Sequence, residues 1–142
     1  MKRSLIREHL FKLLFRIEFN KPEDMPGQVL LYFEDGFAEE DNSSTGSDIP
    51  GADREYIREK YDNIVKMLPQ IDEMIDNAAK GWSINRIGKV ELAVMRLAVY
   101  EMLYDDDIPV GVAIDEAVEL SKRFGTENSG PFVNGILASL AK

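Results

Sequence analysis

One long apolar stretch, residues 82–104, constrains the fold of this chain more than any other part of the sequence. It reads WSINRIGKVELAVMRLAVYEMLY. Ser83 is a suitable N-cap, and the apolar residues after it recur at three- and four-residue spacing around nearly the whole circumference of a helix. Only Lys89 and Arg96 clearly require water. A helix of this kind is typically the centre of a bundle, so we expect the other helices to pack around it.

Helical patterns also fill most of the remaining sequence. The length of 142 residues suits one domain with a cooperative core. Apolar periodicity, capping residues and prolines predict further helices at residues 4–19, 28–37, 53–68, 70–79 and 110–124, and from Pro131 onward. Residues 38–52 are acidic and rich in Ser and Gly without an apolar period, which indicates a mobile loop. The predicted fold class is therefore all-α.

The charge of the chain is unevenly distributed. The formal net charge is -9 at pH 7, which is the wrong sign for a general nucleic-acid binder. Residues 1–21 nevertheless carry six Lys or Arg against two Glu, whereas the remainder carries eleven against twenty-four acidic residues. Positive charge is therefore concentrated at the N-terminal end.

Several classes of protein are disfavoured by what the sequence lacks. It contains no cysteine, which excludes disulfides, thiolate zinc sites and thiol nucleophiles and is compatible with a reducing cytosol. No signal peptide or membrane-spanning segment is recognisable, so we expect a cytoplasmic protein. The one histidine, His9, is placed on the polar side of the first helix, and no phosphate-binding glycine loop is present. We expect no enzymatic activity, no cofactor and no metal site, and we expect Asp105, Asp106 and Asp107 to cap the following helix.

The first predicted helix combines basic and aromatic residues. Arg7, Phe11 and Phe15 run along one flank of its apolar stripe, while Lys12 and Arg16 fall on the far side. Guanidinium groups beside exposed rings suit single-stranded RNA, because they hold phosphates while the rings stack on unpaired bases. The helix alone favours the other interpretation, in which both rings widen the core stripe, because aromatic residues at helical spacing are usually buried.

The C-terminal part of the chain resembles a known family. The segment RIGKVELAVMRLAVYEMLYDDDIPVGVAIDEAVELSKRFGTENSGPFVNGIL, residues 86–137, is similar to the C-terminal signature of the NusB family of bacterial transcription antitermination factors. The parts of that signature occur in order and without gaps across roughly the last sixty residues: a tryptophan at position 82, a long helix ending in a YEL-like triplet, an aspartate-rich corner, an AI-x-EAVEL-x-K-x-FG segment and an FVNG helix. The N-terminal third fits the family more loosely.

The resemblance implies both a fold and a function. The implied fold is a compact bundle of about seven helices in two packed sub-bundles, residues 1–68 and 69–142. The implied function is transcription antitermination, in which the protein binds boxA-type single-stranded RNA together with the ribosomal protein NusE during ribosomal RNA transcription. Other Nus factors and RNA polymerase are the further implied partners. The family also contains dimers, so a homodimer that masks the arginine-rich helix is an alternative.

The resemblance also implies particular site residues. The candidates for RNA binding are Lys2, Arg3, Arg7, Phe15, Lys122, Asn128 and Phe132. Phe15 stands where the family often has tyrosine, and Asn128 where it often has aspartate, a charge that would repel phosphate. Phe132 is a candidate for either the core or base stacking. Gly111 and Asp115 lower the local positive charge relative to the family pattern.

Two carboxylates of the long apolar helix require partners, because an unpaired buried carboxylate is costly. Glu91 is the candidate for contact with NusE, which the family holds with acidic surface, and Glu101 is expected to pair internally. Two other functions stay open. One alternative is a protein-only adaptor that never binds RNA. The other is a stand-alone NusB-like accessory domain of a ribosomal RNA methyltransferase system.

Overall fold

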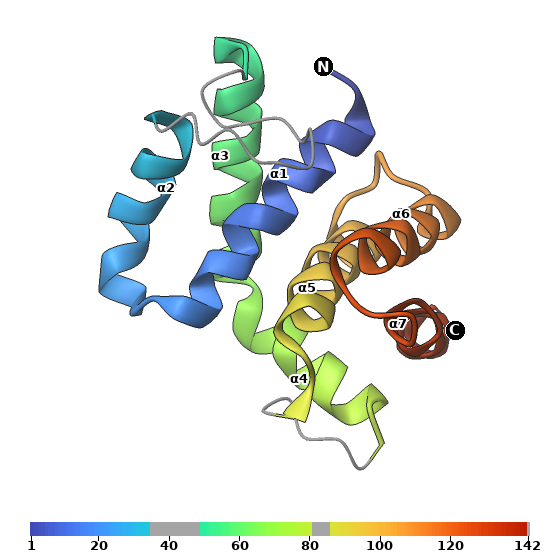
Figure 1. Ribbon diagram of the computed structural model, residues 1–142. Coiled ribbons are helices and arrows are strands. Elements are labelled where there is room, and N and C mark those ends of the chain that lie inside the picture. The colour runs from blue at the N-terminus through green and yellow to red at the C-terminus, as the bar shows by residue number, and fades with distance from the viewer. Residues whose placement is uncertain (35–48, 81–85, 142) are drawn as a thin grey trace. The chain divides into compact units, whose positions relative to one another are not determined.

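The computed structural model describes residues 1–34, 49–80 and 86–141, and over these residues the chain is helical without any β-strand (Figure 1). The seven α-helices of the described residues are α1 (Arg3–Arg16), α2 (Met25–Glu34), α3 (Gly51–Lys66), α4 (Leu68–Ala78), α5 (Lys89–Tyr104), α6 (Val110–Phe124) and α7 (Ser129–Leu140). Short 3₁₀ segments at Ile17–Phe19 and Pro22–Asp24 connect α1 to α2. The predicted all-α class is confirmed.

Two compact units divide the chain, Met1–Asn63 and Ile64–Lys142. The predicted loop of residues 38–52 lies outside the described residues up to residue 48, as do Ser83 and the tryptophan before it. The last residues of that predicted loop are described: Ile49 is buried, and α3 begins at Gly51. None of the helices in the described part of the chain has the length and apolarity that crossing a membrane requires.

In the unit Met1–Asn63, α1 contacts α2, and α1 contributes three fully buried leucines to the interior, Leu10, Leu13 and Leu14. The prediction that His9 lies on the polar side of α1 is wrong, because its side chain is 0% exposed. Its Nδ1 atom lies 2.5 Å from the hydroxyl oxygen of Tyr32 on α2 in a hydrogen bond. A polar ring is tolerated inside the unit because the partner helix supplies that hydroxyl.

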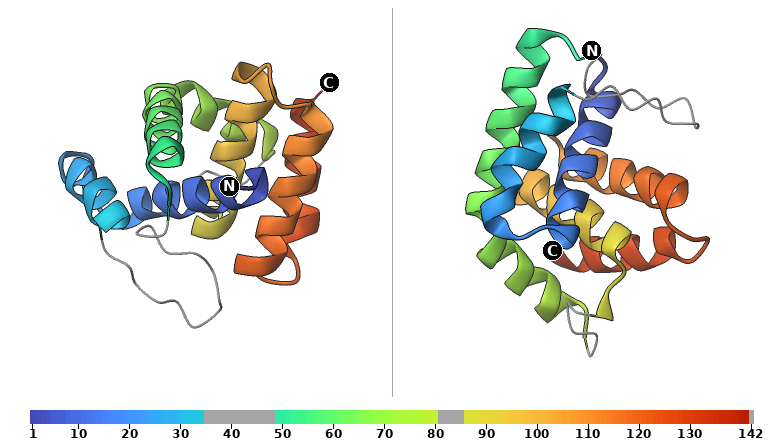
Figure 2. Two further views of the ribbon diagram at one scale, coloured as in Figure 1. Left: turned by 90° about the horizontal axis from the view of Figure 1, so that it is seen from above. Right: turned by 60° about the vertical axis from the view of Figure 1, so that its left-hand side comes forward.

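In the unit Ile64–Lys142, α5 is the central helix. It contacts α4, α6 and α7, and Figure 2 shows α6 and α7 beside it. Every residue from Leu92 to Val99 is buried, so the expected central helix is confirmed within this unit. The helix begins at Lys89, later than predicted, because Gly88 is extended (φ -58°, ψ 147°) and forms its N-cap. Ile87 is buried but precedes the helix.

The expectation that Arg96 faces water is also wrong. Its side chain is buried, with its residue only 7% exposed, and it binds the carboxylate of Asp72 on α4. The Nε–Oδ1 distance is 2.8 Å and the Nη2–Oδ2 distance is 2.9 Å. The planar guanidinium matches the two carboxylate oxygens, so this bidentate pair joins α4 to the central helix.

The aspartate-rich corner between α5 and α6 forms a turn and does not cap the helix. The Oδ1 atom of Asp105 accepts a hydrogen bond of 3.1 Å from the backbone N–H of Asp107. The N-cap residue of α6 is Pro109, and it makes no side-chain capping bond. The expected capping role is therefore replaced by a local turn, in which an aspartate binds the backbone two residues on.

Candidate nucleic-acid interface

Two of the predicted RNA-binding cations lie in the open at the start of α1. Lys2 and Arg3 are both exposed, and Lys2 is the extended N-cap residue without a side-chain capping bond. Cations near a helix N-terminus are unfavourable by about 0.3–1 kcal/mol, because that end carries partial positive charge. No acidic residue of the first turn of α1 offsets them. Helix stability therefore does not explain this placement, whereas an anionic partner would.

Arg7 differs from these two residues, because it is only 4% exposed. A buried guanidinium is part of the protein interior and does not present itself to phosphate in this structure. The sequence shows that Arg7 is charged, but the helical pattern did not indicate that its side chain is buried.

The aromatic residues of α1 and of the 3₁₀ segment that follows it grade from buried to exposed. Phe11 is 3% exposed and belongs to the core, Phe15 is half-buried, and Phe19 is 59% exposed. The ring centroids of Phe11 and Phe15 are 5.9 Å apart, and those of Phe15 and Phe19 are 4.9 Å apart. Phe15 therefore combines core packing with partial exposure.

A second candidate region lies within the unit Ile64–Lys142. An open pocket of about 230 Å³ forms where the start of α5 meets the turn before α7. It brings together three residues predicted from sequence, Glu91, Asn128 and Phe132. Asn128 is exposed and Phe132 is half-buried, so an amide and part of a ring face a shared space.

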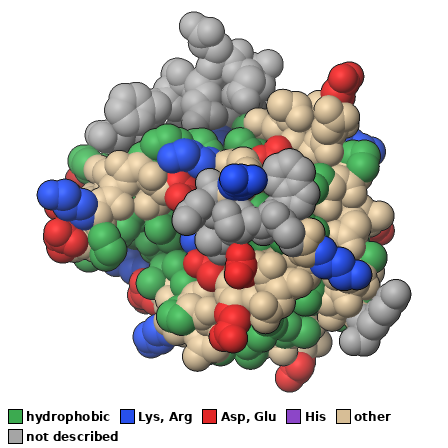
Figure 3. Space-filling view, turned by 90° about the horizontal axis from the view of Figure 1, so that it is seen from below, with side chains coloured by type: hydrophobic (Ala, Val, Ile, Leu, Met, Phe, Trp, Pro, Cys, Tyr) green, Lys and Arg blue, Asp and Glu red, His purple; other side chains and the backbone are tan. Residues whose placement is uncertain are grey.

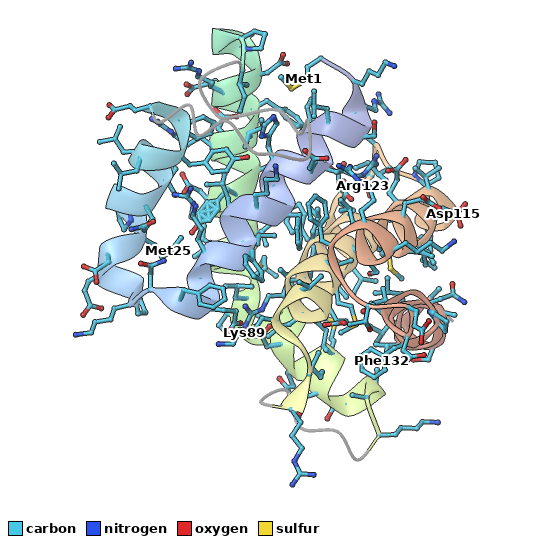
Figure 4. All side chains as sticks on the ribbon, viewed as in Figure 1. Met1, Met25, Lys89, Asp115, Arg123 and Phe132 are labelled. Carbon is cyan, nitrogen blue, oxygen red and sulfur yellow. The ribbon has the colours of Figure 1, made fainter. Side chains whose placement is uncertain are left out.

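Arg86 is a residue of this pocket that the sequence did not single out. It is exposed and stands before the N-cap of α5. A basic residue two positions before a glycine-capped helix start was the available signal. Lys89, also exposed, follows at the first position of α5, and Figure 4 labels it together with Phe132. A guanidinium, an amide and a ring are the groups that hold the phosphate, edge and face of a nucleotide.

Lys122 lies near this region on α6. Its side chain is exposed and its Nζ atom is 3.7 Å from Glu119, an exposed ion pair. Its stem passes over the start of α7, since a Cβ added at Gly130 would be 3.6 Å from the Lys122 Cγ atom. Asp115, which Figure 4 labels, is exposed further back on α6 and adds negative charge, as the sequence indicated.

Glu91 was predicted to face a protein partner, but its side chain also has a partner within this unit. It is half-buried, and its Oε1 atom accepts a hydrogen bond from the Ser129 hydroxyl on α7. Glu101 is 1% exposed, in agreement with the interior position expected for it.

On the face shown in Figure 3, basic and acidic side chains are interspersed with apolar patches, and the visible Lys and Arg do not gather into one patch. Among the described residues, no group of His, Asp and Glu is arranged to hold a metal ion. The candidate interface is therefore defined by particular side chains and not by a broad basic surface.

Comparisons with known proteins agree with this fold. Residues 4–142 match the NusB family. The transcription antitermination protein NusB of Lachnoclostridium phytofermentans is 45% identical over 140 residues, which cover 99% of this chain and 98% of that protein. The solved structure of Thermotoga maritima NusB has a TM-score of 0.78 and 37% identity, covering 99% of this chain and 91% of that chain. A solved complex of NusB and NusE with double-stranded RNA has the same fold, with a TM-score of 0.75, 24% identity and coverage of 98% and 95%.

Proposed function

Because this chain belongs to the NusB family of transcription antitermination proteins, we propose that it is an RNA- and protein-binding antitermination factor of the cytoplasm. Its RNA is a boxA-type single-stranded element, and its protein partner is the ribosomal protein NusE. The joint complex acts with other Nus factors on RNA polymerase during ribosomal RNA transcription. The protein has no catalytic role in this scheme.

The observation that carries the proposal is the pocket at the start of α5, because it combines the groups that one unpaired nucleotide requires. The half-buried ring of Phe132 offers a stacking face, and the amide of Asn128 offers a donor and an acceptor to a base edge. Arg86 is the adjacent exposed cation for phosphate. Among the residues that the structure describes, Glu91 is the one acidic residue that lines the pocket, and its carboxylate accepts a hydrogen bond from Ser129.

Exposed cations in the unit Met1–Asn63 give the proposal separate support. Lys2 and Arg3 stand at a helix terminus where their charge is unfavourable unless an anion binds. We assign them to phosphate contacts, which give affinity without much sequence choice. Phe15 is the partly exposed ring of that unit, and we assign it to base stacking. Arg7 is assigned to the interior because of its burial.

A protein-only adaptor is the second candidate function. It is favoured by the net charge of -9 and by exposed carboxylates such as those of Asp115 and Glu119 on α6. These charges suit a basic protein partner and would repel RNA. The adaptor binds NusE with the same affinity whether or not RNA is present.

Fluorescence anisotropy separates the two functions. A labelled boxA RNA, a scrambled single strand and a duplex of equal length are titrated with the protein, with and without NusE, over a salt series. The proposal predicts tighter binding of boxA RNA than of either control in the presence of NusE. Failure of the wild-type protein to bind any RNA, even with NusE, would establish the adaptor.

Charge-removal variants test the phosphate contacts. Lys2→Ala and Arg3→Ala should each weaken binding of boxA and scrambled RNA alike and flatten the salt slope by about 0.7. Lys66→Ala, which removes an exposed cation from the last turn of α3, is the matched control and should leave the slope unchanged. If all three variants have the same salt slope, Lys2 and Arg3 do not contact the RNA phosphates.

A further inference from the structure

The turn before α7 is closed by two reciprocal hydrogen bonds. The backbone N–H of Ser129 donates to the carbonyl of Thr126 at 3.1 Å, and the backbone N–H of Thr126 donates to the Ser129 hydroxyl at 2.9 Å. Asn128 lies between these residues and is exposed. Its position in the pocket therefore depends on how firmly the turn is held.

Glu91 connects this turn to the central helix of its unit. The Ser129 hydroxyl, which accepts from Thr126, donates its own hydrogen to the Oε1 atom of Glu91 in the first turn of α5. Ser129 is only 2% exposed, so water does not readily replace either partner. One buried hydroxyl thus joins the turn that carries Asn128 to the start of α5.

The hydrogen bond between Glu91 and Ser129 has room because two neighbouring residues, Gly88 and Gly125, have no side chain. A Cβ atom at Gly88 would lie 2.1 Å from the Oε2 atom of Glu91, and a Cβ atom at Gly125 would lie 2.4 Å from the Ser129 hydroxyl oxygen. Both distances are far below van der Waals contact. The backbone on each side of the Glu91–Ser129 pair is therefore shaped around these two side chains.

We propose that Glu91 is a positioning residue for RNA, which acts through Ser129 to fix the 126–129 turn so that Asn128 can read an unpaired base. The inference rests on the proposed RNA-binding function and assigns Glu91 a role other than direct contact with a protein partner. An exposed turn that is fixed before binding loses less conformational entropy when the base arrives. Ordering one residue's backbone costs about 1–2 kcal/mol, which corresponds to about tenfold in affinity.

Three variants test this role in the complex saturated with NusE. Glu91→Ala removes the acceptor and should weaken boxA binding about tenfold. Glu91→Gln keeps a carbonyl oxygen for the Ser129 hydroxyl and should stay within about threefold of wild type. Glu73→Ala removes one exposed carboxylate from α4 and is the control for the change in net charge, with no loss of affinity expected.

A double-mutant cycle identifies the route of the effect. If Glu91 acts through the turn, Asn128→Ala should weaken RNA binding in the wild type but cost little more in the Glu91→Ala background. Amide hydrogen exchange at Thr126 should accelerate in Glu91→Ala, and the affinity for NusE without RNA should not change. Gly88→Ala, which displaces the carboxylate without removing it, should reproduce the RNA defect if Glu91→Ala proves too unstable to assay.

Two results would overturn the inference while leaving the proposed function intact. One is wild-type boxA affinity for Glu91→Ala together with unchanged exchange at Thr126. The other is an equal loss of NusE affinity and RNA affinity, which would make Glu91 a direct partner contact. Absence of boxA preference in the wild-type protein would instead refute the proposed function, whereas the exchange rate at Thr126 would still decide whether Glu91 holds the turn.

Discussion

Removing the carboxylate of Asp72 should destabilise the unit Ile64–Lys142 strongly. The change Asp72→Ala removes the bidentate carboxylate of Arg96, a residue that is only 7% exposed. Breaking a buried ion pair from one side costs about 3–5 kcal/mol. Because the Asp72 side chain is 29% exposed, water replaces part of what is lost, and we expect a loss of about 2–4 kcal/mol in the free energy of unfolding.

A substitution of Arg96, the other member of the pair, should lower the free energy of unfolding less than Asp72→Ala does. Arg96→Met places an apolar chain of similar length among the buried residues of α5 and leaves a carboxylate that water reaches in part, so it should cost about 1 kcal/mol. The double variant should be close to wild type, because neither charge is then left unpaired. Non-additivity of this kind identifies the penalty as that of a buried charge that has lost its bidentate carboxylate.

Urea unfolding followed by circular dichroism measures these changes, and the chain offers a matched control. Glu119→Ala breaks the Lys122–Glu119 pair, whose side chains are 62% and 67% exposed, and should cost at most about 0.5 kcal/mol. A loss below about 1 kcal/mol for Asp72→Ala, similar to that of the control, would refute burial as the source of the penalty.

Three further predictions address other parts of the chain. Burial raises the pKa of Tyr61 to about 12, so the folded state keeps a proton that the unfolded state loses above pH 10. Stability should therefore fall as pH rises, by about 1.4 kcal/mol at pH 11, and urea titrations should show a shallower fall for Tyr61→Phe; identical pH profiles would contradict this. Tyr32→Phe should cost about 1–3 kcal/mol in urea unfolding, because buried His9 loses its hydroxyl partner, and a neutral change would speak against that bond. Phe15→Ala should weaken boxA binding measured by anisotropy by about 1–3 kcal/mol, whereas Phe15→Tyr keeps the stacking face and should not; equal losses would exclude stacking.

The fold class could be predicted because its signals are local. Helix α6 begins and ends where the sequence indicated, at Val110 and Phe124, since an amphipathic period lies between Pro109 and Gly125. The start of α5 was predicted too early, because that prediction also rested on local apolar periodicity alone. Ile87 continues the apolar period and is buried, but it lies before the N-cap Gly88 and outside the helix, which periodicity cannot distinguish from a helical position.

The positions of polar residues on apolar helices could not be predicted in the same way. A polar side chain on an apolar face either reaches water or finds a buried partner on another helix. The partners of Arg96 and His9 are Asp72 and Tyr32, which stand on neighbouring helices far away in the sequence. No local pattern reports such a pair, because the packing of two helices brings it together.

The candidate site shows the same division. Family resemblance identified Asn128, Phe132 and Glu91 as site residues, and the structure brings these three into one pocket. The bond from Ser129 to Glu91 was not predictable, because it depends on how α7 meets α5. Arg86 was overlooked because no family role was assigned to it.

The most direct test of the proposed RNA interface is a map of backbone amide chemical shifts during titration with boxA RNA in the presence of NusE. We predict that RNA shifts the amides of Lys2, Arg3 and the 126–129 turn, and that a scrambled strand at the same concentration shifts the turn much less. Shifts confined to other surfaces, with the turn and the start of α1 unchanged, would contradict the proposed interface.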